Sequence, residues 1–179
     1  YAFTDTNACT NTQSQYTTVN PIPTVSFTGL AEEYCIDEIG SPLTGSPAGG
    51  TFTGTGMVGN TFEPSIPGVG YSIVIYAFTD TNACTNTQSQ YTTVNPIPTV
   101  SFTGLAEEYC IDEPTVQLTG SPVSGTFSGS GINGNYFDPS SGEGFFDITY
   151  TFTDTNSCTN SETQSVTVFP LPVVGFTGL

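Results

Sequence analysis

Five cysteines are the residues of this chain with the clearest capacity for chemistry, and their spacing repeats. A zinc site would need clustered ligands such as Cys-x-x-Cys or histidine, so we favour disulfides over a metal centre. We expect the pairs Cys35–Cys84 and Cys110–Cys158, with the partner of Cys9 outside the segment. Each pair would close a loop of about 50 residues, which stabilises the fold by roughly 4 kcal/mol in the chain-entropy model. Disulfides indicate an oxidising, extracellular location.

Acidic and amide side chains recur two to four residues before three of these cysteines, in the tripeptide Asp-Thr-Asn. Oxygen ligands of this kind suit calcium. Alternatively, Asp and Asn shape a turn through hydrogen bonds of their own side chains. The calcium hypothesis groups Asp80 and Asn82 with Glu33 and Asp37, and likewise Asp154 and Asn156 with Glu108 and Asp112. We expect no other cofactor.

Catalysis is not expected from this set of residues. The chain has no histidine, lysine or arginine, so a serine or cysteine nucleophile has no evident activating base. Paired carboxylates can cleave glycosides, and Glu32–Glu33 and Asp37–Glu38 are the candidates. Adjacent residues of a strand point to opposite faces, however. We therefore assign no catalytic residues and predict that the protein is not an enzyme.

The charge of the chain excludes two classes of partner. Its formal net charge is −16, without any basic side chain. Nucleic-acid binding requires the basic groups that are missing, and attraction to an anionic membrane fails for the same reason. No apolar run is long enough to cross a bilayer, and no signal segment opens the chain. We expect neither nucleic-acid binding nor membrane insertion.

Internal repetition organises the whole chain. Residues 1–38 recur letter for letter as residues 76–113, and a looser copy begins at Tyr150, so a repeat architecture is expected. Stretches with two prolines each, which stiffen the chain, separate the repeat units. We predict two complete units, bead one (residues 21–95) and bead two (residues 96–169). Residues 1–20 would be the last two strands of a preceding bead, and residues 170–179 the first strand of a following one.

Short strands joined by turns account for the composition, which is rich in Thr, Ser, Gly, Asn and Pro. In the stretch FFDITYTFTDT, residues Phe146, Ile148, Tyr150 and Phe152 alternate with polar residues, which indicates a half-buried strand. About seven short strands per bead predict an all-β chain of small immunoglobulin-like sandwiches in tandem, each with one disulfide.

One outer face differs between the beads. The same alternation places Ile73 and Ile75 on the outer face of bead one, with Tyr91 on the paired strand. Bead two has Asp147, Thr149 and Ser165 at these positions. We predict that Ile73, Ile75 and Tyr91 form a contact patch for a second strand of beads or a flat ligand. A harmless exposed patch is the alternative.

The stretches GLAEEYCIDE, GTFSGSGINGNYF and YTFTDTNSCTN, at this spacing, resemble the tandem repeats of giant surface proteins in Bacteroidetes, the SprB-type gliding-motility adhesins. The resemblance covers essentially the whole chain. It implies export through the type IX secretion system and display as a long cell-surface filament, and it supplies no catalytic residues.

From these observations we predict the shaft of an extracellular surface adhesin or filament, used for gliding motility or attachment. Its expected partners are neighbouring repeats of the same chain, with lateral self-association or a surface polysaccharide in addition. A carbohydrate-binding module array and a secreted structural fibre are the alternatives.

Overall fold

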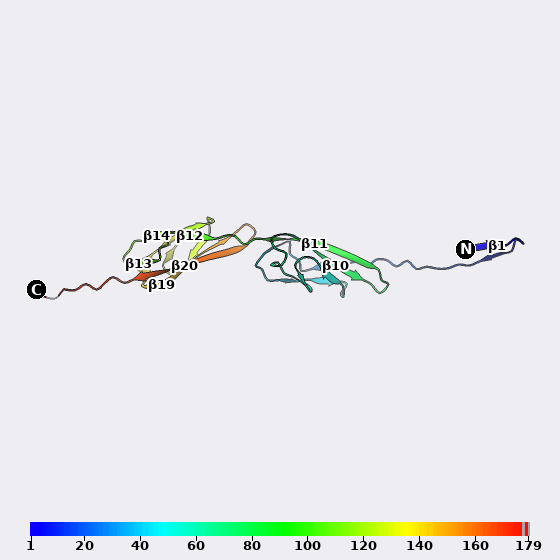
Figure 1. The fold of residues 1–179 in the computed structure, drawn as a ribbon, viewed down its shortest axis with the longest axis horizontal. Helices are drawn as coiled ribbons and strands as arrows, with labels where there is room; N and C mark the ends of the chain where they lie inside the picture. Colours follow the sequence, from blue (N-terminus) through cyan, green and yellow to red (C-terminus); the bar gives the residue numbers. More distant parts are fainter. Residues whose placement is uncertain (177, 179) are drawn as a thin grey trace.

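A computed structural model describes residues 1–176 and 178 of the chain and shows an all-β protein with two similar halves. The two beads follow one another along the longest axis, and the N- and C-terminal segments extend from opposite ends (Figure 1). The two beads therefore form two units in line. No helix among the described residues has both the length and the apolar character needed to cross a membrane.

Bead one contains nine strands within residues 21–95, all of which the structure describes. They are β3 (Ser26–Thr28), β4 (Glu33–Cys35), β5 (Ser41–Pro42), β6 (Thr44–Ser46), β7 (Thr51–Thr53), β8 (Met57–Val58), β9 (Thr61–Phe62), β10 (Gly70–Thr79) and β11 (Thr85–Asn95). The long hairpin of β10 and β11 is the centre of a four-stranded sheet in the order β4-β11-β10-β7. Two small sheets, β3-β6 and β5-β9-β8, complete the bead.

Bead two repeats this arrangement strand for strand. Its elements are β12 (Ser101–Thr103), β13 (Glu108–Cys110), β14 (Val116–Gln117), β15 (Thr119–Ser121), β16 (Thr126–Ser128), β17 (Ile132–Asn133), β18 (Tyr136–Phe137), the short 3-10 helix η1 (Pro139–Ser141), β19 (Gly144–Thr153) and β20 (Thr159–Phe169). The main sheet has the order β13-β20-β19-β16, and the small sheets are β12-β15 and β14-β18-β17. The number of strands per bead exceeds the seven expected, because several are only two residues long and carry no pattern visible in sequence.

The core of each bead lies between the main sheet and the two small ones. In bead one, Val74 and Tyr76 of β10 pack with Phe27 of β3 and Phe62 of β9, all buried. The alternation predicted for residues 146–152 is confirmed in bead two, where Ile148 and Tyr150 are buried and Phe146 and Phe152 pack against the core. Burial of these apolar faces is the main force that holds each small bead together.

A buried tyrosine organises the centre of each core. The Tyr76 hydroxyl donates to the Pro47 carbonyl oxygen (2.5 Å) and accepts from the Gly50 N–H (2.8 Å). A Cβ at Gly45 would overlap the Tyr76 ring, so only glycine leaves room for it. Tyr150 makes the same two bonds in bead two, to Pro122 and Gly125, and lies in the same way against Gly120.

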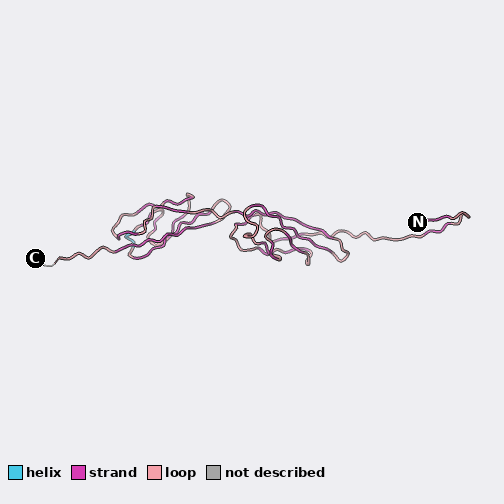
Figure 2. Tube along the Cα trace, in the orientation of Figure 1, coloured by secondary structure: helices cyan, strands magenta, loops and turns pink. Residues whose placement is uncertain are grey.

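Both end segments are extended away from the beads. Strands β1 (Ala2–Thr4) and β2 (Thr10–Thr12) form an isolated hairpin, and a long loop connects it to bead one (Figure 2). Residues 170–176 form no strand. The strand predicted over residues 170–179 is therefore not seen in residues 170–176 and 178, and Thr177 and Leu179 lie outside the described residues.

Replacing Tyr76 with Phe should lower the free energy of unfolding by about 1 to 2 kcal/mol, because the Gly50 N–H and the Pro47 carbonyl lose their buried partner. Tyr150→Phe should cost a similar amount in bead two. Urea unfolding of both variants measures the loss. Tyr71→Phe is the control, since Tyr71 is 88% exposed, and a loss of similar size there would contradict the explanation.

Candidate functional site: the joint between the beads

The cysteine of the Glu-Tyr-Cys tripeptide lies where the chain leaves the bead. Strand β4 pairs in parallel with the last residues of β11, so that Cys35 lies beside Asn95. The Ile36 N–H donates to the Asn95 carbonyl (2.9 Å), and the Cys35 N–H donates to Oε1 of Glu38 (3.1 Å). Tyr34, the residue before Cys35, is buried in the core. Cys35 is thereby fixed at the end of bead one that faces bead two.

Cys158, the cysteine of the Asp-Thr-Asn-Ser-Cys stretch, lies at the tip of the hairpin that β19 and β20 form in bead two. Oδ1 of Asp154 accepts from the backbone N–H groups of Asn156 and Cys158, each at 2.9 Å. Ser157 takes a positive φ of 68° to close the turn. The Asp154 side chain therefore shapes the turn, as in the alternative to calcium, and it holds the Cys158 backbone in one position.

Cys35 and Cys158 form a disulfide across the joint, with 5.5 Å between their Cα atoms. Both are buried, at 5% and 0% exposure. The predicted pairs Cys35–Cys84 and Cys110–Cys158 are wrong, because Cys9, Cys84 and Cys110 are free thiols. The expectation of one disulfide within each bead is replaced by one disulfide between the two beads.

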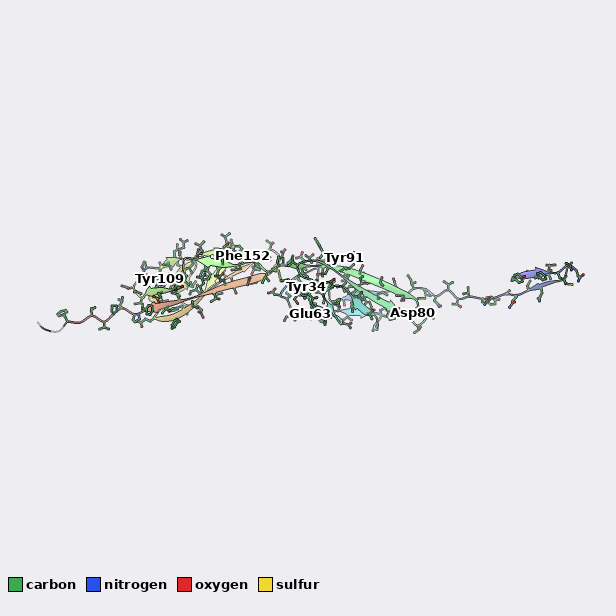
Figure 3. All side chains as sticks on the ribbon, viewed as in Figure 1. Tyr34, Glu63, Asp80, Tyr91, Tyr109 and Phe152 are labelled. Carbon is green, nitrogen blue, oxygen red and sulfur yellow. A yellow bond between two sulfur atoms is a disulfide. The ribbon has the colours of Figure 1, made fainter. Side chains whose placement is uncertain are left out.

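The length of β11 explains this correction. Cys35 pairs with the last residue of β11, whereas Cys84 immediately precedes its first residue, Thr85. A strand of 11 residues spans about 35 Å, while a disulfide needs Cα atoms within about 7 Å. Figure 3 shows the same polarity, with Asp80 near the end of bead one that faces the N-terminal hairpin and Tyr34 on the side toward bead two. In bead two, β20 separates Cys110 from Cys158 in the same way.

A second contact ties the linker to the following bead. The Asn160 side chain donates from Nδ2 to the Pro98 carbonyl oxygen (2.8 Å), and Asn86 does the same to Pro23 in bead one. Val100, shortly after the linker, is buried in the core of bead two. Sequence reasoning missed both asparagines. Their signal was available, since each lies two residues after a hairpin cysteine.

The residues grouped for calcium do not come together within a bead. Asp80 and Asn82 lie at the hairpin tip, and Glu33 and Asp37 lie at the far end of β11. The same separation holds in bead two for Asp154 and Asn156 against Glu108 and Asp112. Within residues 1–176 and 178, no group of three or more Asp, Glu, His or Cys side chains is arranged to hold a metal ion.

The predicted contact patch lies on the outer face of the main sheet of bead one. Ile73 and Tyr91 are directly opposite on β10 and β11, at 37% and 69% exposure, and Ile75 is half-buried. In bead two the equivalent Asp147 and Ser165 join by a hydrogen bond of 2.6 Å. Whether the patch binds anything stays a prediction.

Bead two carries an open, shallow hollow of about 710 Å³ over strands β14, β17 and β18. Polar side chains surround a partly exposed tyrosine there, and the residues are Gln117, Asn133, Asn135, Tyr136 and Asp138. Bead one has Pro42, Val58, Asn60, Thr61 and Glu63 at the corresponding strand positions. The hollow is therefore a property of bead two, and sequence reasoning did not identify it.

Reduction of the disulfide should lengthen the fully stretched chain by about 430 Å, because the bond shields a segment of 123 residues and each residue adds about 3.5 Å. Two disulfides within the beads would shield less, about 340 Å in total. Pulling single molecules by their two ends, with and without reductant, measures the difference. Cys35→Ser should behave as the reduced chain does, and an unchanged length in that variant would contradict the pairing.

Asp154→Ala should loosen the hairpin tip by about 1 to 2 kcal/mol, since two backbone N–H groups lose a charged acceptor. The Cys35–Cys158 bond should then form less completely, by about tenfold in its equilibrium constant, in a fixed glutathione buffer. Asp80→Ala is the matched control, because it removes the same two bonds at the tip of bead one and leaves the joint untouched. Equal losses in both variants would rule out a role for the tip in the joint.

Comparison with known proteins adds little to this picture. No family of known proteins matches the chain, and no curated protein matches it. Among solved structures, it is similar to a Ca2+-stabilised adhesin that helps an Antarctic bacterium reach out and bind ice, with 14% identity and a TM-score of 0.43. The similarity covers 98% of this chain and 57% of the solved chain, so this chain spans little more than half the length of that solved chain.

Proposed function

We propose that the chain is part of the shaft of an extracellular surface adhesin or filament. The observation that carries the proposal is the buried disulfide between consecutive beads. A bead that only had to fold would be stabilised by a bond within itself, whereas Cys35–Cys158 closes no loop within either bead. It fixes the orientation of one bead relative to the next, which is a property that a shaft needs.

Two further features support a shaft. The linker between the beads contains prolines, which restrict its backbone, and the Asn160 bond to Pro98 holds it against bead two. The chain also has a formal net charge of −16 without basic side chains. Chains of this charge repel one another at low salt.

The finer assignment rests on the sequence resemblance alone. On that basis we propose a shaft of a SprB-type adhesin of Bacteroidetes, exported by the type IX secretion system and used for gliding motility or attachment. We also propose that each bead, with its main sheet and two small sheets, is an immunoglobulin-like sandwich. The disulfide supports an oxidising, extracellular compartment.

A carbohydrate-binding array is the second candidate. The hollow of bead two combines Tyr136 with amide and carboxylate side chains, a set that can stack on and hydrogen-bond to a sugar. Bead one presents Tyr71 and Tyr91 on its outer face. These aromatic residues do not all recur in both beads, since Ser165 replaces Tyr91, and this irregularity favours the shaft.

In the full-length protein, replacing residues 21–169 with unrelated β-sandwich beads of equal total length should preserve attachment, because a shaft contributes length and stiffness. Attachment of cells to their surface and filament length by electron microscopy are the measurements. Deleting residues 21–169 is the control for length. Loss of attachment after the replacement, at unchanged length, would support the carbohydrate-binding array.

A further inference from the structure

Cys110 has the same surroundings as the bonded Cys35, although it is itself a free thiol. Its N–H donates to Oε1 of Glu113 (2.9 Å), as that of Cys35 does to Glu38. It lies beside Phe169 at the end of β20, the strand that leads out of bead two. One half of a joint is therefore already built at the far end of bead two.

Cys84 has the surroundings of the bonded Cys158. Oδ1 of Asp80 accepts from the N–H groups of Asn82 (2.9 Å) and Cys84 (2.8 Å), and Ala83 takes a positive φ of 63°. The other half of a joint is built at the near end of bead one. The turn has the same geometry with and without a disulfide, so the backbone is positioned before the bond forms.

Exposure separates the bonded cysteines from the free ones. Cys35 and Cys158 are buried, whereas Cys110 is exposed and Cys84 is partly exposed. Local structure is otherwise the same, so the difference comes from the neighbouring bead that covers Cys35 and Cys158. The exposure of Cys110 and Cys84 is therefore the exposure expected of a joint cysteine when the second bead of its joint is absent.

We infer that the joint is serial. Cys110 bonds to the hairpin cysteine of a bead that follows bead two, and Cys84 bonds to the Glu-Tyr-Cys cysteine of a bead that precedes bead one. The chain carries pieces of both neighbours on its flanks. Residues 1–13 repeat the hairpin sequence of residues 76–88, and FPLPVVGF from Phe169 resembles the linker NPIPTVSF from Asn95.

The bond forms by thiol–disulfide exchange. The Cys110 thiolate attacks an external disulfide, such as oxidised glutathione, and releases one reduced thiol. The hairpin thiolate of the next bead then attacks the mixed disulfide and releases the second. Two protons and two electrons leave the protein, and the external disulfide is reduced to two thiols.

The test lengthens the chain by a second copy of residues 96–169, with the copy of Cys110 replaced by Ser, placed directly after Phe169. The protein is folded in a glutathione buffer, labelled with iodoacetamide without reduction, and mapped with a Glu-directed protease and chymotrypsin. In the original chain Cys110 takes the label. In the lengthened chain Cys110 should lose it and appear in a cross-linked peptide with the copy of Cys158.

The matched control is the same lengthened chain in which the copy of Cys158 is replaced by Ser, where Cys110 should take the label again. Protection of Cys35 and Cys158 in every sample reports that the beads are folded. In a chain with Cys9 replaced by Ser, a corresponding copy of residues 21–75 placed before Tyr1 should remove the label from Cys84 through the copy of Cys35. The inference is overturned if Cys110 stays labelled in the lengthened chain, or if the copied cysteine bonds elsewhere.

Discussion

The parallel pairing of β4 with the last three residues of β11 determines the rest of the arrangement. It places Cys35 beside Asn95, where the chain leaves bead one, and buries Tyr34 in the core. Because the hairpin tip of the next bead points back toward this end, a single short strand decides which cysteines can meet. Without that pairing, Cys35 would have no fixed position relative to Cys158.

The joint changes the route by which tension passes through the protein. The shortest covalent path across two beads runs from Cys35 to Cys158 through the disulfide, then along β20 and the linker that follows it. Strand β20 is already extended over 11 residues, so little slack remains on that path. Tyr76 and Tyr150 lie outside this path, whereas the core residues Phe27 and Tyr34 of bead one and Val166 and Val168 of bead two lie on it.

Sequence patterns predicted the strands because burial imposes them directly. The alternation from Phe146 to Phe152 follows from one face packing on the core, and the turn role of Asp80 and Asp154 follows from their local hydrogen bonds. The cysteine pairing could not be predicted in this way. In a repeat protein, the Glu-Tyr-Cys cysteine can pair with the hairpin cysteine of its own bead or with that of the next bead. The two hairpin cysteines lie in similar sequences, so the sequence does not distinguish the two pairings. The choice depends on where three-residue β4 docks, about 60 residues away in sequence from its partner strand, and no local pattern records that.

The spacing of the two bonded cysteines also fixes an order of events during synthesis. Cys35 cannot find its partner until the hairpin of bead two has emerged, 123 residues later. Cys84 emerges before then, but once bead one has folded it lies at the other end of β11 and out of reach. Folding of each bead ahead of oxidation therefore protects the waiting thiol from the wrong partner. In the serial joint that we infer, each bond therefore closes only after the following bead has folded, from the first bead to emerge toward the last.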